Sequence, residues 1–155
     1  MKHLALAVVL AAGLFPGTAL ACTVPAGAKA MESGLIDWIN GARAQKGLAR
    51  LKPSGKLDKA ADAHACDMAS RGFFSHKGPG GPTLQKRLKT AGYRFSAAVE
   101  NIGKSRKASA DTAAGIWRNS SAHWANILNP SIRDIGVAVA TDGSNVYYVF
   151  VGGSQ

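Results

Sequence analysis

The chain has 155 residues, with 19 Lys or Arg against 9 Asp or Glu, a formal net charge of +10 and two cysteines. The length suits one domain with a sizeable core, and the sequence shows no internal repeat or long linker, which excludes a repeat array or a two-domain chain. The basic residues are scattered, without interleaved aromatic residues. This excludes a specific nucleic-acid motif and leaves a basic surface that attracts anionic partners.

Residues 1–21 are typical of a secretory signal peptide. Lys2 precedes an unbroken apolar run over residues 4–15, and the Ala-Leu-Ala sequence at 19–21 forms an A-x-A cleavage site. The apolar run is too short to span a membrane. We therefore expect residues 22–155 to form the mature chain, a single domain without a transmembrane segment, either periplasmic or secreted.

Both cysteines, Cys22 and Cys66, lie beyond the expected cleavage site. In an oxidising compartment an even number of cysteines favours a disulfide, which here would join the new N-terminus to a helix. A second interpretation makes Cys22 the lipid-bearing first residue of a lipoprotein. Ala-Leu-Ala at 19–21 matches an A-x-A cleavage site better than it matches a lipobox. The disulfide is therefore the favoured interpretation.

Two amphipathic helices are predicted first. Ser33 is expected to cap one, with Gly47 after its last turn, and the other begins after Ser54 and stops at Gly72. Their apolar positions follow the spacing of a buried helix face: Leu35, Trp38, Ile39 and Ala42 in the first, and Leu57, Ala61, His64 and Met68 in the second. The lone histidine on that face, His64, is interpreted as a satisfied core residue.

Shorter elements follow. A loop rich in glycine and proline leads to a short helix capped by Thr83, and the segment 93–103 reads as extended. A helix is predicted near 109–118, a further helical segment begins at Ser120 or Ser121, and two β-rich runs flank an Asp-Gly turn at 142–143. This order predicts an α+β fold in which helices cover an antiparallel sheet.

Three ionisable residues in apolar settings are candidates for one shared polar site: His76, Glu100 and His123. His76 precedes the glycine-rich loop, and the ring of His123 can turn away from the apolar stripe of its helix. Glu100 lies in an apolar strand, where a carboxylate without a partner is costly.

These residue types suit a metal. Two neutral imidazoles favour zinc, copper or nickel, and a carboxylate can bind the metal, orient a histidine or polarise a water. His76 and His123 are far apart in the sequence and share no helix face, so spacing alone leaves separate structural roles open.

Several sequence blocks together resemble the CAP or SCP family, which comprises cysteine-rich secretory, antigen 5 and pathogenesis-related proteins. The first block is "INGARAQKGLARLKPSGKLDKAADAHACDMA". It is followed, in the order of the family's bacterial branch, by "FSHKGPGGPTLQKRLKTAGY", "VENIG" and "WRNSSAHWANILNPSIRDIGVAVA". The resemblance covers about residues 33–152, nearly the whole expected mature chain.

The resemblance implies an α-β-α sandwich, with a small antiparallel sheet between helical layers, and a cleft lined by two histidines and two acids. The two histidines correspond to His76 and His123, and one acid corresponds to Glu100. The second acid falls on Asn119, which is neutral. In related proteins the histidines can hold a divalent metal, often zinc, and no organic cofactor is implied. Glu100 would then support a histidine or polarise a water, or simply hold the cleft together.

Function is less constrained, because members of the family differ in their reported roles. The favoured interpretation is an exported binding module of the bacterial cell envelope with a metal-competent cleft, whose partner is an anionic envelope ligand, lipid or glycan. The alternative is a metal-dependent hydrolase, in which His76 and His123 hold zinc and Glu100 acts as the base. Whether the protein is an enzyme is left open.

Overall fold

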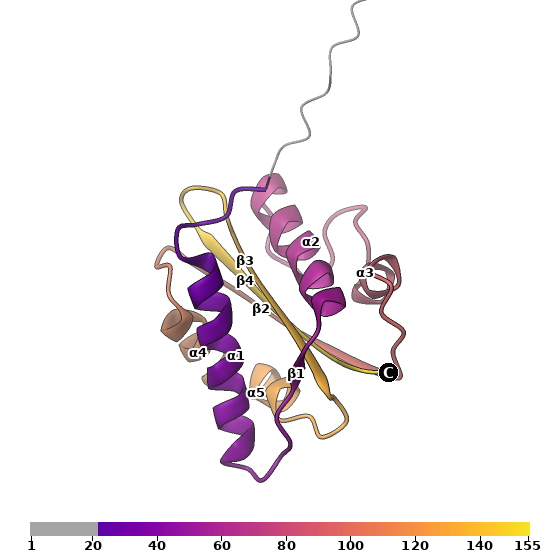
Figure 1. Ribbon diagram of the computed structural model, residues 1–155. Coiled ribbons are helices and arrows are strands. Elements are labelled where there is room, and N and C mark those ends of the chain that lie inside the picture. The colour runs from indigo at the N-terminus through magenta and orange to yellow at the C-terminus, as the bar shows by residue number, and fades with distance from the viewer. Residues whose placement is uncertain (1–21) are drawn as a thin grey trace, which may run out of the picture.

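The computed structural model describes residues 22–155, and the predicted signal peptide lies outside these described residues. Two layers of helices enclose one sheet (Figure 1). The elements in chain order are α1 (Ala28–Ala44), β1 (Lys52–Pro53), α2 (Gly55–Arg71), α3 (Leu84–Thr90), β2 (Ala97–Ser105), α4 (Ala110–Arg118), α5 (Ser121–Ile127), β3 (Asp134–Thr141) and β4 (Val146–Ser154).

The sheet has the strand order β1-β3-β4-β2. Its three long strands are antiparallel, and β3 and β4 form the hairpin predicted around Asp142 and Gly143. The short strand β1 pairs in parallel with β3 through Lys52 and Pro53 alone. The predicted antiparallel sheet is therefore right for the long strands but misses β1, since two residues are too few to show an alternating pattern.

Alternation along the strands divides the core into two halves. Val146, Tyr148 and Phe150 of β4 lie in a cluster with α1, α4 and α5, whereas the intervening residues of β4 lie in a cluster with α2 and α3. Figure 1 shows these two groups of helices on opposite sides of the sheet. The predicted α-β-α sandwich is confirmed.

The first helix begins earlier than predicted. Ser33 was expected to be the N-cap, but α1 starts at Ala28, with Gly27 as its N-cap, and Ser33 is an exposed residue inside the helix. The reason is that Ala28 and Met31 continue the buried stripe backwards from Leu35. Burial of these two side chains stabilises an additional turn, which outweighs the capping preference of serine.

Cys22 and Cys66 form a disulfide, with their Cα atoms 5.2 Å apart, so the predicted pairing is confirmed. A sulfur in this bond cannot carry a thioether lipid, which counts against the lipoprotein interpretation of Cys22. The bond fixes the start of the described chain to α2. Within residues 22–155, no helix combines the length and the apolar character that a bilayer crossing requires.

Candidate functional site

The predicted site residues meet at the edge of the sheet formed by β2. Because side chains alternate along a strand, Glu100 and Ile102 of β2 face the layer of α2 and α3, while Val99 and Asn101 face the layer of α4 and α5. Since β2 is an edge strand, groups from both helical layers can approach each other beyond it. We call this region, comprising His76, Glu100 and His123, the edge cleft.

Glu100 is the most buried group of the edge cleft, with its side chain only 3% exposed. It forms a two-point ion pair with Arg87 of α3: Nη1 donates to Oε2 over 2.6 Å and Nη2 donates to Oε1 over 3.2 Å. The Arg87 side chain is equally buried. A buried carboxylate persists only with such a partner. The pair with Arg87 therefore offsets the free-energy cost of burying Glu100 in an apolar strand.

The same carboxylate orients His76. The Nδ1–H of His76 donates to Oε1 of Glu100 over 2.9 Å, which leaves Nε2 of the ring without this constraint. The imidazole itself is 57% exposed. Glu100 therefore holds Nδ1 of His76 and leaves Nε2 open to a ligand. Histidines that bind metals are commonly oriented in this way.

The loop that carries His76 is held at two consecutive carbonyl groups. Arg87 Nη2 donates to the carbonyl oxygen of His76 over 3.1 Å, and His64 Nε2 donates to that of Ser75 over 2.9 Å. His64 lies in α2, is fully buried, and also approaches Oε1 of Glu100 to 3.9 Å. His64 is thus the satisfied core histidine that was predicted, and it has the further role of positioning the loop.

His123 is held from the other layer. Ser120 caps α5 by accepting from the backbone N–H of His123, and Asn101 donates to the carbonyl oxygen of His123 over 2.9 Å. Asn126 then donates to the backbone oxygen of Glu100 over 3.1 Å, which joins α5 to the edge strand. The Nδ1 atom of His123 is buried and has no hydrogen-bond partner among the described residues.

Arg43 fixes the far end of α5. Its guanidinium is buried and donates to the carbonyl oxygens of Ile127 and Asn129, each over 2.9 Å. These carbonyls lie at the end of α5 and just beyond it, where a positive charge is favourable. Together with Asn126 and Asn101, Arg43 therefore sets where the short helix presents His123.

A hollow of about 370 Å³ opens beside the Arg87–Glu100 pair. Its lining residues come from the loop after α2, from α3, from β2 and from α5: His76, Lys77, Thr83, Leu84, Gln85, Ala98, Val99, Glu100 and Asn126. The volume falls in the range of small-ligand sites. Two of the residues selected from the sequence, His76 and Glu100, line the hollow, whereas His123 is not among its lining residues.

Asn119, at the position of the family's second acid, ends α4 as its C-cap residue. Its side chain is exposed and, within residues 22–155, makes no hydrogen bond to His76, Glu100 or His123. The structure thus brings three of the four predicted residues into one connected network and leaves Asn119 at its border.

Burial and neighbouring charges set the protonation of the site. Burial alone would raise the pKa of Glu100, but hydrogen bonds from His76 and Arg87 outweigh it and hold that pKa below its usual value of 4.5. Burial lowers the pKa of His64 below 6.5. Burial, and then the proximity of His76, lowers the pKa of His123 as well.

We expect these shifts to make the protein less stable in acid. Below pH 6.5 the unfolded chain binds protons at His64 and His123 that the folded state resists, so the free energy of unfolding falls as pH drops. Below pH 4.5 the unfolded chain also protonates Glu100, and the stabilisation from that carboxylate is lost as pH falls through its lowered folded pKa. Urea unfolding midpoints measured across this range check the prediction.

The His64→Gln variant serves as the control for this experiment, because the glutamine amide can still donate to the carbonyl oxygen of Ser75. The dependence of its stability on pH below 6.5 should be shallower than in the wild type. Identical slopes for the two proteins would show that His64 does not titrate differently in the folded and unfolded states.

Sequence reasoning missed the residues that support the site, namely His64, Arg87, Asn101 and Asn126. One signal for Arg87 was present. With Leu84 and Leu88 it occupies the i, i+3 and i+4 positions of a short amphipathic helix, so it shares their buried face. A cation on such a face indicates a buried partner, and Glu100 was the carboxylate without one.

His76 and His123 are the two residues of the edge cleft that could hold a metal. His76 keeps Nε2 free of Glu100, and His123 has a buried nitrogen without a protein partner. In the part of the chain that the structure describes, no group of three or more His, Cys, Asp or Glu side chains is positioned to hold a metal ion. Water would therefore supply the remaining ligands, and Glu100 would act through His76 rather than on the metal.

Residues 36–153 match the model of the cysteine-rich secretory protein family, CAP. Among curated relatives, the Bacillus subtilis protein YkwD is 32% identical over 130 residues, which cover 84% of this chain and 50% of YkwD. The membrane protein YlbC of the same organism is 31% identical over 108 residues, covering 70% and 31% of the two chains. The chain thus spans half or less of the length of these relatives.

Solved structures agree with this match. An extracellular SCP-domain protein of Bacillus anthracis has a TM-score of 0.75 and 26% identity, with 83% of this chain and 41% of that one covered. An outer surface protein of Borrelia burgdorferi has a TM-score of 0.77 over 87% of this chain and 99% of its own, and at 19% identity it supports the fold alone. Since the family model covers most of this chain, the protein belongs to the cysteine-rich secretory protein family, CAP.

Proposed function

We propose that this protein is an exported binding module of the cell envelope, whose edge cleft takes a divalent metal such as zinc through His76 and His123. The signal-like sequence over residues 1–21 and the net charge of +10 support export and an anionic envelope partner. The similar solved structure from Bacillus anthracis is named as an extracellular protein, which agrees with such a location.

One observation carries the metal-binding part of this proposal. A buried carboxylate, neutralised by Arg87, holds Nδ1 of His76, and across the strand edge His123 has a buried Nδ1 without a protein partner. Unpartnered buried polar atoms are rare in folded proteins because they cost free energy, and a ligand removes that cost. When bound, zinc would polarise a ligand or a water as a Lewis acid.

The geometry does not favour the hydrolase alternative, in which Glu100 is the base. Both oxygens of Glu100 already accept hydrogen bonds from Arg87 and His76, and its pKa lies below the usual value. A carboxylate with these partners is a weak base and has little room to accept a proton from water. Binding therefore fits the site better than hydrolysis.

A zinc titration of the protein by calorimetry tests the metal site. We expect saturable binding of one zinc ion. The His76→Ala and His123→Ala variants should each bind about tenfold or more weakly, because each removes one of only two protein ligands. Lys77→Ala is the matched control, since it changes the neighbouring side chain in the same hollow and removes no ligand.

Zinc binding that is absent in the wild type, or equal in the wild type and both histidine variants, would contradict the metal site. The envelope role has a separate test, sedimentation of the purified protein with envelope fractions. Because the expected attraction is electrostatic, sedimentation should weaken as salt is added. A protein that stays in solution even at low salt would contradict this role.

A further inference from the structure

A second hollow lies between α1 and the junction of α4 with α5. Its volume is about 550 Å³, and it is lined by Trp38, Gly41, Ala42, Gln45, Lys46, Arg118 and Trp124. We call it the tryptophan groove. None of its residues belongs to the polar network around Glu100.

Two neighbouring tryptophans, Trp38 and Trp124, contribute the aromatic part of the groove's lining. The rings of Trp38 and Trp124 are 6.1 Å apart between centroids, tilted by 50°, and each is only partly buried against the core. Sequence reasoning placed both on core stripes, and the structure shows that one side of each remains accessible. A partly exposed pair of large aromatic rings beside a hollow is typical of a binding surface.

The indole N–H groups of this pair are also free. Trp117 donates its Nε1–H to the carbonyl oxygen of Ile102 over 3.1 Å. Within the described residues, Trp38 and Trp124 make no such bond, and neither indole nitrogen is among the buried unpartnered atoms. Neither donor is therefore fully buried, and a ligand with hydroxyl groups can accept from them.

Two cations border the aromatic walls. The guanidinium carbon of Arg118 lies 5.5 Å from the centroid of the Trp38 ring, and Lys46 lines the same hollow. In residues 22–155 neither of these two residues pairs with a carboxylate, whereas Arg71, Arg87 and Lys29 do. The charge of Arg118 and Lys46 is therefore available to an anionic group, and Arg118 offers the planar fork that a carboxylate fits.

The base of the groove is open because of Gly41. A Cβ atom added at Gly41 would meet no atom within 4 Å, so the space above the α1 backbone is empty. The space over Gly41 is therefore open to a ligand.

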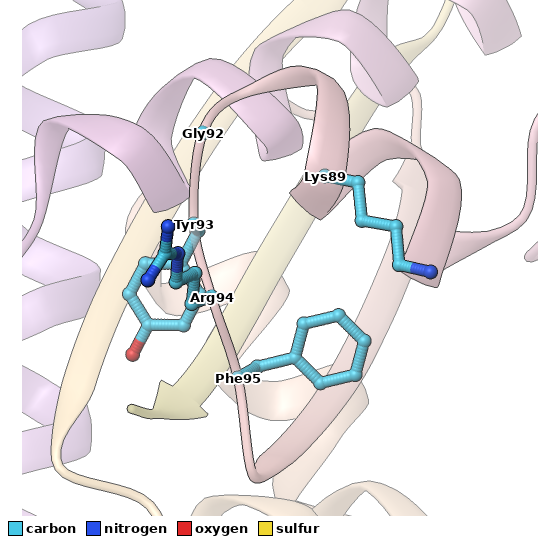
Figure 2. Close-up of a pocket in the computed structure, with 5 residues that line it drawn as sticks. All are labelled: Lys89, Gly92, Tyr93, Arg94 and Phe95. Atoms are coloured by element: carbon cyan, nitrogen blue, oxygen red, sulfur yellow. The ribbon is translucent and has the colours of Figure 1, made fainter.

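A comparison with another hollow of about 550 Å³ shows what is particular to the tryptophan groove. That hollow is lined by Lys89, Gly92, Tyr93, Arg94 and Phe95 (Figure 2). Figure 2 shows Lys89 and Arg94 projecting to opposite sides of Phe95, so their charges do not converge. The hydroxyl of Tyr93 is engaged with Asp134, over 2.6 Å.

We propose that the tryptophan groove binds a carboxylate-bearing sugar of an acidic glycan. The C–H face of a pyranose ring stacks on the electron-rich face of Trp124, because Arg118 already lies over the Trp38 ring. The indole N–H groups and Gln45 bond the hydroxyl groups, and Arg118 pairs with the carboxylate. A fatty acid fits less well, because an acyl chain needs an enclosed apolar channel and this groove has polar residues along its walls.

This inference rests on the envelope-binding role proposed above and does not involve metal binding at the edge cleft. Calorimetric titration with trigalacturonate, in the presence of EDTA, tests it directly. We expect saturable binding to the wild-type protein and binding of the neutral maltotriose that is roughly tenfold or more weaker, because the carboxylate pair is missing. Arg118→Gln should weaken trigalacturonate binding by a similar factor, and Gly41→Leu should abolish it by filling the groove.

Arg94→Gln is the matched control, because it removes one positive charge from the other hollow. Circular dichroism confirms that each variant is folded. Equal weakening by Arg94→Gln and Arg118→Gln would show attraction by net charge alone and overturn the proposal. The proposal is also overturned if trigalacturonate does not bind at low-millimolar concentration, or if decanoate binds in the groove and trigalacturonate does not.

Envelope sedimentation of the same preparations separates this inference from the proposed function. If the protein sediments with envelope fractions but does not bind trigalacturonate, saccharide binding in the tryptophan groove is wrong and the envelope role stands. Trigalacturonate binding without sedimentation overturns the envelope role and leaves the groove as a saccharide site.

Discussion

Replacement of Arg87 by methionine is expected to lower the free energy of unfolding by about 3–5 kcal/mol, because it leaves a buried charge without its partner. Arg87 and Glu100 are each 3% exposed, and Arg87 supplies both hydrogen bonds of the two-point pair. The variant also loses the bond from Arg87 to the carbonyl oxygen of His76. Urea unfolding at neutral pH, with and without the substitution, measures the change.

Glu100→Gln and the double variant Arg87→Met/Glu100→Gln complete the experiment. Removal of both charges should recover part of the loss caused by Arg87→Met, because the double variant has no unpaired buried ion. A double variant that loses the sum of the two single changes would show that the two groups act independently. Zinc titration of the same proteins should show weaker binding in both single variants, since each disturbs the support of His76.

The structure gives these two residues a wider role than an ion pair. Glu100 belongs to the edge strand, Arg87 to α3, and the His76 loop is bonded to both. His64 of α2 holds the adjacent carbonyl of the same loop. The loop is thus fixed by two helices of one layer and by the edge strand, and α5 of the other layer carries His123. The cleft is preorganised before any ligand arrives.

Most of the fold follows from local patterns in the sequence. The apolar spacing of α2, the serine caps of α4 and α5, and the Asp-Gly turn each specify an element through contacts within a few residues. The two errors have a common cause. The start of α1 and the pairing of β1 depend on burial against distant segments, which no local pattern records.

The site was predicted less completely than the fold. His76, Glu100 and His123 were first selected as ionisable residues in apolar settings, and the resemblance then matched each of them to a residue of the family's cleft. Its partner Arg87 was not identified, because their pairing depends on how α3 packs beside β2. The amides of Asn101 and Asn126 were missed for a similar reason, since they bridge β2 and α5 and bond mainly to backbone oxygens.

The second large effect is expected at Gly136 of β3, where alanine should lower the free energy of unfolding by about 3 kcal/mol or more. A Cβ atom there would lie 2.2 Å from the carbonyl carbon of Leu57 and 2.3 Å from the backbone nitrogen of Asp58. These are backbone atoms of α2, so no side-chain rotation relieves the overlap. The whole helix would have to move away from the sheet, and His64 would move with it.

Gly115→Ala is the control, because a Cβ atom at Gly115 in α4 would meet nothing within 4 Å. Alanine is the better helix former, so this variant should gain about 0.5–1 kcal/mol of stability. Urea unfolding of the two variants compares the same chemical change at a crowded and an open position. Equal effects at Gly136 and Gly115 would contradict the close contact of α2 with β3. A loss at Gly136 accompanied by weaker zinc binding would show that the sheet sets the position of the histidine loop through α2 and His64.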